Sequence, residues 1–170
     1  ALLIACDDFV SQPDTTPSSF NNVIALRRAL LRDKRGYQRI RVSVNQALDG
    51  EGFSALAAQA FDGAAEGDVS LVYLSTHGMK SGEDGEGFTA LMSDGARETY
   101  LSSSDLHAGL DPIPGKKILI LDACFSGAAI NKGMDEPRIS SLFTGPDFKV
   151  LTSAGGMEPS FLWTDGLGTV

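Results

Sequence analysis

Cysteine and histidine are scarce in this chain, whose 170 residues include two cysteines, Cys6 and Cys124, and two histidines. A disulfide framework needs more cysteines than this, so we expect a reduced, cytoplasmic setting. Basic residues are also in deficit, because the chain has 14 Lys and Arg but 22 Asp and Glu, which gives a net charge of -8. This charge disfavours nucleic acid and anionic membranes as partners and suits a cationic ligand.

Long hydrophobic runs are lacking as well. No apolar segment approaches the roughly 20 residues of a membrane span, and the chain opens in a short apolar run rather than in a charged leader and signal core. We find no internal repeat, low-complexity tract or linker. With 42% hydrophobic residues the chain can bury one substantial core, so we predict a single domain over residues 1–170 and no membrane partner.

What the chain does contain is an alternation of strand-like and helix-like patterns. Apolar runs predict strands at 1–5, 40–44, 69–75, 118–122 and 150–153. Helical spacing predicts helices over 20–34, with Ser18 or Ser19 as its cap, over 53–65 and over 105–110. After a glycine-rich acidic loop at 78–87, the runs 88–92 and 98–101 predict a small β-hairpin.

This order of elements predicts an α/β fold. Apolar strands that alternate with helices favour a mostly parallel central sheet with both faces covered, and the hairpin is expected to be an insertion outside that sheet. Ligands in such folds gather beyond the carboxyl ends of the strands. Residues that follow the strands are therefore the candidates for function.

Two of the predicted strands end in residues with catalytic chemistry. The run that ends at Ser75 leads into His77 and Gly78, and the run that ends at Asp122 leads into Cys124. A thiolate is a strong nucleophile, and a nearby imidazole can accept the proton of the thiol. Backbone N–H groups near Cys124 and Gly78 can face a developing oxyanion. The pattern indicates nucleophilic catalysis.

The remaining cysteine and histidine are expected to be structural. Cys6 lacks the closely spaced partners that a zinc site requires, so we predict a buried thiol and assign no metal ligand. His107 lies between Leu106 and Leu110 in a predicted helix, which favours a half-buried or surface position.

The two catalytic segments resemble those of a known family, the caspase-like cysteine peptidases, which include metacaspases and bacterial caspase-like enzymes. Residues 75–78, Ser-Thr-His-Gly, are similar to the Ser-Gly-His-Gly histidine segment of that family. Residues 122–127, Asp-Ala-Cys-Phe-Ser-Gly, are similar to its Asp-x-Cys-x-Ser-Gly nucleophile segment. The resemblance covers most of the chain and implies a caspase-like α/β/α sandwich.

The resemblance also implies an activity: a cysteine endopeptidase that cuts a polypeptide substrate through a thioester acyl-enzyme. His77 would be the acid/base, Cys124 the nucleophile, and the backbone N–H groups of Gly78 and Cys124 the oxyanion donors. The family requires no third catalytic side chain, and no cofactor is expected.

Asp122 is a candidate for substrate binding, because a residue two places before Cys124 on one strand would project to the same side. In metacaspases the matching aspartate binds the arginine or lysine before the scissile bond, so the resemblance implies cleavage after Arg or Lys. Asn22 stands where metacaspases commonly have a second pocket acid. Asp7 or Asp8, at the end of the first strand, is a candidate for the missing carboxylate.

Control of the enzyme is a further expectation from the resemblance. Metacaspases are often activated by calcium, and Glu83, Asp84 and Glu86 form an acidic loop, although their spacing does not match a calcium loop. Relatives are often cut after the nucleophile strand, where Lys132 and Arg138 are candidate self-cleavage sites. We expect the chain to be an incomplete or processed catalytic portion, with the remaining C-terminal part or a regulatory or effector domain as its partner.

Two alternatives from other functional classes stay open. A receiver-like phosphoacceptor domain would hold magnesium with Asp7 and Asp8, but it requires a lysine after the last strand, and Lys149 precedes that strand. A catalytically inactive caspase-like interaction module is the second alternative, and the intact His77 and Cys124 argue against it.

Overall fold

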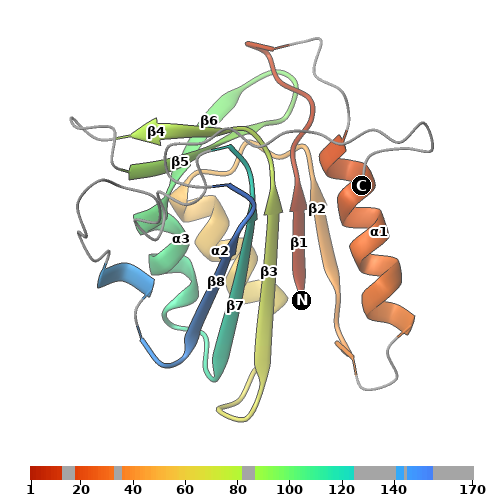
Figure 1. Cartoon of the computed structure of the whole chain (residues 1–170), viewed down its shortest axis with the longest axis vertical. Helices are drawn as coiled ribbons and strands as arrows, with labels where there is room; N and C mark the ends of the chain where they lie inside the picture. Colours follow the sequence, from red (N-terminus) through yellow and green to blue (C-terminus); the bar gives the residue numbers. More distant parts are fainter. Residues whose placement is uncertain (13–17, 33–35, 82–86, 125–140, 144, 155–170) are drawn as a thin grey trace.

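The centre of the molecule is a five-stranded sheet in the order β2-β1-β3-β7-β8, in which every neighbouring pair is parallel. The computed structural model describes residues 1–12, 18–32, 36–81, 87–124, 141–143 and 145–154. The strands are β1 (Leu2–Ala5), β2 (Arg41–Val44), β3 (Val69–Ser75), β7 (Lys116–Asp122) and β8 (Phe148–Thr152). All five predicted strands form, and Figure 1 shows their carboxyl ends at one edge.

Both faces of this sheet are apolar, as the continuous hydrophobic runs predict for buried parallel strands. Along β1 the side chains alternate between two cores: Leu2 and Ile4 belong to the larger one, and Leu3 and Ala5 to the smaller one. All four are buried.

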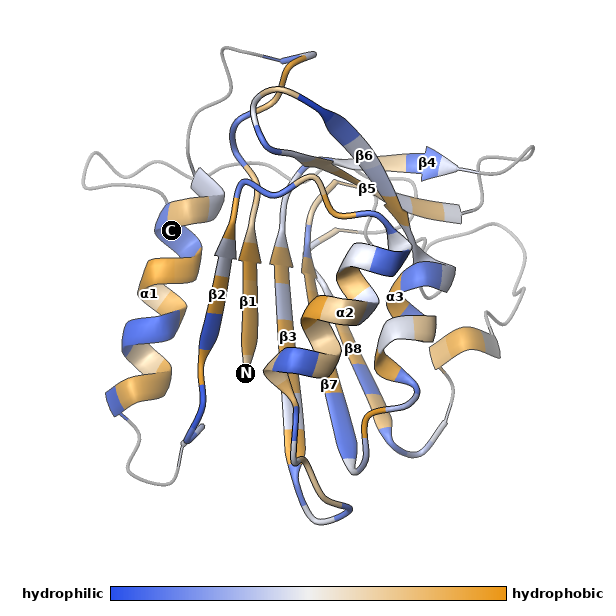
Figure 2. Cartoon of the chain, turned by 180° about the vertical axis from the view of Figure 1, so that it is seen from behind, coloured by the Kyte–Doolittle hydropathy of each residue, from blue (hydrophilic) through white to orange (hydrophobic). Residues whose placement is uncertain are grey.

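Helices cover the two faces and produce the predicted α/β/α sandwich. The helices α2 (Gly50–Ala60) and α3 (Ser103–Leu110) pack on the larger core, and Figure 2 shows them in front of the sheet. Helix α1 (Ser18–Arg32) packs on the smaller core through the buried Val23. None of the helices in the described ranges has the length and apolar character needed to cross a membrane.

The bounds of α2 differ from the predicted 53–65. Asp49 caps the helix, because its side chain accepts a hydrogen bond of 2.8 Å from the N–H of Gly52, so α2 begins earlier than the hydrophobic spacing suggests. It ends at Ala60, and Gly63, with φ of 78°, lies in the turn that follows. The caps of a helix, rather than its apolar spacing, set where it begins and ends.

A second, antiparallel sheet lies beyond the carboxyl ends of the central strands (Figure 1). It contains β4 (Gly78–Ser81), β5 (Gly87–Ser93) and β6 (Glu98–Ser102), and β5 and β6 form the predicted hairpin. Strand β4 corrects the prediction of a loop over 78–87. Its pairing with β5, in which Gly78 faces Ala90, supplies hydrogen bonds that the local glycine-rich composition does not reveal.

Candidate active site

The pairing of β3 with β7 brings the histidine and cysteine segments together. Ser75 faces Asp122 at the end of the register, and the N–H of Thr76 donates to the Asp122 carbonyl at 3.3 Å. His77 and Cys124 each follow this last pair by two residues, at the carboxyl edge of adjacent strands. Two segments far apart in the sequence therefore meet where the α/β fold exposes ligand sites.

The backbone beside Cys124 is hydrogen-bonded to a residue that follows the neighbouring strand. The backbone of Ala123, immediately before it, donates to Ser153 Oγ at 3.1 Å and accepts from the same hydroxyl at 3.3 Å. Ser153 follows β8, and its own N–H donates to Leu121 at 3.0 Å. Cys124 itself is half-buried and carries a thiol, not a disulfide. The hydroxyl of Ser153 thus fixes the backbone that presents the thiol, a function that its place in the sequence did not reveal.

His77 is half-buried beside the ring of Phe9, with 4.6 Å between the ring centroids. Burial lowers the pKa of His77, and the negative charge of Asp7 acts in the opposite direction. The His77 carbonyl accepts a hydrogen bond of 2.9 Å from the N–H of Leu91 on β5. The small sheet therefore anchors the histidine segment, and the lowered pKa favours the neutral imidazole, which can accept a proton.

Gly78 lies directly against the cysteine segment. A β carbon at this position would overlap the carbonyl oxygen of Cys124 and would approach the Phe88 ring to 2.9 Å. Glycine at this position therefore allows the backbone of Cys124 to reach β4. The role of both residues as oxyanion donors stays a prediction.

The carboxylate of Asp122 accepts hydrogen bonds from three neutral side chains. Tyr73 Oη donates to Asp122 Oδ2 at 2.6 Å, Asn22 Nδ2 donates to it at 3.2 Å, and Ser75 Oγ donates to it at 3.4 Å. Burial, and then the hydrogen bond and charge of Asp122, raise the pKa of Tyr73. The structure thus brings together two of the predicted substrate-binding residues, Asp122 and Asn22.

Sequence reasoning missed Tyr73 at this site, although a signal was available. Tyr73 and Ser75 lie two residues apart on β3, so they share a face of the sheet, and the parallel register places Ser75 next to Asp122. The prediction that Asp122 and Cys124 project to the same side assumed that both lie on one strand. Cys124 lies in a turn after β7, so the alternation of side chains along that strand does not determine where Cys124 points.

The two candidate acids after β1 lie in different surroundings. Asp7 accepts hydrogen bonds from the N–H groups of Ser19, at 2.9 Å, and Phe20, at 2.7 Å, in the first turn of α1. Asp8 is exposed and lies at the turn between β5 and β6, where a β carbon on Gly95 would come within 2.5 Å of its carboxylate. Asp7 therefore caps a helix, and the substrate-binding role of Asp8 stays a prediction.

Cys6 is buried and bonded to the small sheet. Its thiol donates to the Ser93 carbonyl at 3.3 Å and accepts from the Ser93 N–H at 3.1 Å. Burial raises the pKa of the Cys6 thiol to about 11. A thiol in this state is a poor nucleophile at neutral pH, which leaves Cys124 as the candidate.

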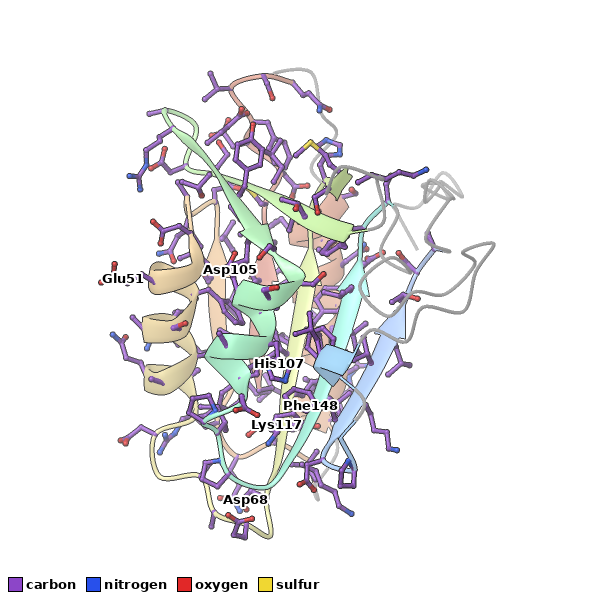
Figure 3. All side chains as sticks on the ribbon, turned by 90° about the vertical axis from the view of Figure 1, so that its left-hand side faces the viewer. Glu51, Asp68, Asp105, His107, Lys117 and Phe148 are labelled. Carbon is purple, nitrogen blue, oxygen red and sulfur yellow. The ribbon has the colours of Figure 1, made fainter. Side chains whose placement is uncertain are left out.

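His107 lies away from both segments, in an aromatic cluster beside the start of β8. Its ring stacks on Phe148 with 5.3 Å between centroids and meets Phe143 edge-on at 5.5 Å. Lys117 places its ammonium 4.9 Å from the Phe148 ring centre. Figure 3 shows His107, Phe148 and Lys117 gathered there, and His107 is half-buried, as predicted.

Several predicted features lie outside the described residues: Glu83, Asp84, Glu86, Ser126, Gly127, Lys132 and Arg138. In the described part of the chain, no three His, Cys, Asp or Glu side chains gather in a way that could hold a metal ion. An open groove of about 760 Å³, with Tyr37 and Arg39 in its lining, lies at the amino ends of the strands, opposite the His77 and Cys124 edge.

Two comparisons relate the chain to known proteins. The family model of the caspase domain, Peptidase C14, matches residues 1–160. Among solved structures, the chain is similar to a protein from Geobacter sulfurreducens, with a TM-score of 0.57 and 15% sequence identity over 72% of this chain. The matched region is 49% of that protein, so this chain spans about half of its length, and the likeness concerns the fold alone. No curated protein sequence matches the chain.

Proposed function

The chain belongs to the caspase-domain family, whose members are in general cysteine peptidases, and on this premise we propose that it is an endopeptidase with a catalytic dyad of His77 and Cys124. The observation that carries the proposal is the β3–β7 register, which delivers the imidazole and the thiol to adjacent strand ends. Family membership also sets aside the receiver-like alternative.

The proposed reaction has two halves. His77 accepts the proton of Cys124 as the sulfur attacks the peptide carbonyl, and the resulting oxyanion is bound by the backbone N–H groups of Gly78 and Cys124. The C–N bond then breaks, His77 returns the proton to the leaving amine, and a thioester remains. Water, deprotonated by His77, hydrolyses this thioester and regenerates the thiol. No cofactor takes part in these steps.

We propose cleavage after arginine or lysine, with Asp122 as the residue that binds the basic side chain. The hydrogen-bond donors to its carboxylate among the described residues are neutral, so they orient the carboxylate without cancelling its charge. A guanidinium or ammonium would supply the missing positive charge. The net charge of -8 favours the approach of such a substrate.

The test is hydrolysis of fluorogenic peptides that end in Arg, Lys or Asp. We expect the Arg and Lys peptides to be cut and Cys124→Ala and His77→Ala to lose at least about a thousandfold in kcat, because each removes a reacting group. His107→Gln is the matched control and should retain activity. If only the Asp peptide is cut, the basic specificity is wrong, and if neither dyad variant loses activity, the dyad is wrong.

Alkylation provides a readout that needs no substrate. Cys124 is half-buried, whereas Cys6 is buried and has a pKa raised to about 11, so iodoacetamide should modify one cysteine, Cys124. An unreactive Cys124 in a folded chain that cuts none of the peptides would favour the inactive interaction module.

A further inference from the structure

We propose that Phe9 is a positioning residue for His77, whose imidazole it holds at the carboxyl edge of β3, next to the segment that carries Cys124. The inference rests on the proposed function, because the position of the imidazole matters for catalysis only if His77 exchanges a proton with Cys124. Phe9 lies in the loop after β1 and belongs to no segment predicted to be catalytic.

The contact between the two rings is the first observation. Their centroids are 4.6 Å apart and their planes are inclined by 45°. Phe9 is 3% exposed and belongs to the larger core, whereas His77 is half-buried and keeps part of its surface in contact with solvent. A fixed aromatic ring on one side of the imidazole limits the rotamers that His77 can adopt.

The chain before Phe9 is anchored through Cys6. The Cys6 N–H donates to the Ser75 carbonyl at 3.0 Å, two residues before His77, and its thiol exchanges hydrogen bonds with the backbone of Ser93 on β5. The loop that carries Phe9 is thus tied both to the strand that carries His77 and to the small sheet.

Asp7 supplies a second pair of anchors. Its N–H donates to Asn45 Oδ1 at 2.9 Å, and its carboxylate accepts from the first turn of α1 through Ser19 and Phe20. Phe9 therefore lies shortly after Cys6 and Asp7, whose backbone N–H groups and side chains together bind four separate segments. Because its loop is anchored in this way, the Phe9 ring can restrict the orientation of His77, as the residues around a catalytic group orient that group.

The position of Phe9 has a consequence for protonation. Covering the imidazole with an apolar ring disfavours the imidazolium, which is consistent with the lowered pKa of His77, while the Asp7 carboxylate acts against this effect. Other titratable groups at the described strand ends include the exposed Asp8, the thiols of Cys6 and Cys124, and the Asp122 carboxylate, which accepts a hydrogen bond from Tyr73 on β3. Phe9 thus favours the form of His77 that accepts a proton.

The experiment follows the titration of His77 by NMR in the full chain. The sequence has two histidines, so His107→Gln assigns both imidazole signals. We expect a wild-type His77 pKa below its ordinary value, a higher pKa in Phe9→Leu, which keeps an apolar side chain, and a larger rise of the pKa in Phe9→Ala. Circular dichroism confirms that each variant is folded, and Phe9→Leu keeps the test decisive if Phe9→Ala does not fold.

Phe53→Leu is the matched control, because Phe53 is a fully buried core ring between α2 and α3, away from His77. It loses the same atoms and should leave the His77 titration unchanged. A titration that is unaffected in both Phe9 variants, or that moves equally in Phe53→Leu, overturns the proposal.

Hydrolysis of the Arg peptide separates positioning from simple loss of stability. At the pH optimum we expect Phe9→Leu to lower kcat about tenfold with little change in KM. The substitution displaces the imidazole that takes part in the reaction but leaves the residues that bind the substrate in place. An unchanged kcat would contradict the positioning role. If the wild-type chain cuts no peptide while the His77 titration still depends on Phe9, the proposed function fails and the ring contact stands.

Discussion

At the residue scale, Gly78 determines how closely the histidine and cysteine segments approach each other. The carbonyl of Cys124 occupies the place where any other residue at position 78 would carry a β carbon. Because the obstructing atom belongs to the backbone of Cys124, it cannot turn away as the end of a flexible side chain could. A substitution at position 78 therefore has to move the backbone of Cys124, the proposed nucleophile.

We predict that Gly78→Ala lowers kcat/KM by about a hundredfold or more, since a displacement on the order of 1 Å is enough for such a loss. Peptide hydrolysis measures the effect, and circular dichroism checks that the variant is folded. Gly67→Ala is the control, because a β carbon at Gly67 would have nothing within 4 Å and activity should be retained. Normal activity in Gly78→Ala would show that the Cys124 backbone does not need this contact.

At the element scale, the start of α1 depends on a residue outside the helix. Ser18 and Ser19, the predicted caps, are the first residues of α1, and the N–H groups of Ser19 and Phe20 donate instead to Asp7. A carboxylate at this end of a helix satisfies orphan donors and complements the helix dipole. Asp7 thereby ties α1 to the end of β1.

The capping contact predicts that Asp7→Ala lowers the free energy of unfolding by about 1 kcal/mol, within the usual range for loss of a helix cap. Urea denaturation measures the change. Asp8→Ala is a matched control on the next residue, because Asp8 is exposed and bonds to no helix terminus in the described ranges, so its effect should stay within about 0.5 kcal/mol. Equal losses in the two variants would argue against a capping role for Asp7.

At the scale of the whole molecule, the fold and the net charge both bear on the proposed binding of basic substrates. The parallel sheet gathers the strand ends that carry Asp122 and lead into His77 and Cys124, and the chain as a whole has a net charge of -8. A net negative charge speeds the approach of cationic ligands, and dissolved salt screens this effect.

Salt should therefore weaken the use of basic substrates. We predict that kcat/KM for an Arg peptide falls by about threefold to tenfold between low and high ionic strength, mainly through KM. Kinetics at 0.02 M and about 0.5 M NaCl measure it, with a peptide of the same scissile residue and added acidic residues as the comparison. An equal response of both peptides would indicate that long-range charge does not guide binding.

The strands, the parallel sheet and the placement of His77 and Cys124 at one edge of that sheet could be predicted because their signals are local. An apolar run, a following glycine and a reactive side chain all lie within about ten residues of one another, and strand ends meet at one edge in any parallel sheet. The resemblance to metacaspases also indicated Asn22 as a candidate for substrate binding, although its hydrogen bond to Asp122 joins α1 to β7.

Other features could not be predicted, because each depends on a contact across the fold. Strand β4 forms through β5, Asp7 caps a helix eleven residues further along the chain, and Phe9 meets His77 through the packing of a loop. Tyr73 lies within an apolar run, which predicts only a core position in β3. Its hydrogen bond to Asp122 depends on the pairing of β3 with β7.

By itself, the sequence determined the alternation of strands and helices, the choice of His77 and Cys124 as candidates and the negative charge, because these follow from side-chain chemistry and periodicity along the chain. Only the tertiary structure decided which groups surround them. Register, packing and burial set the donors of Asp122, the ring beside His77 and the carbonyl against Gly78, since these contacts join segments whose separation in sequence carries no information about their distance in space.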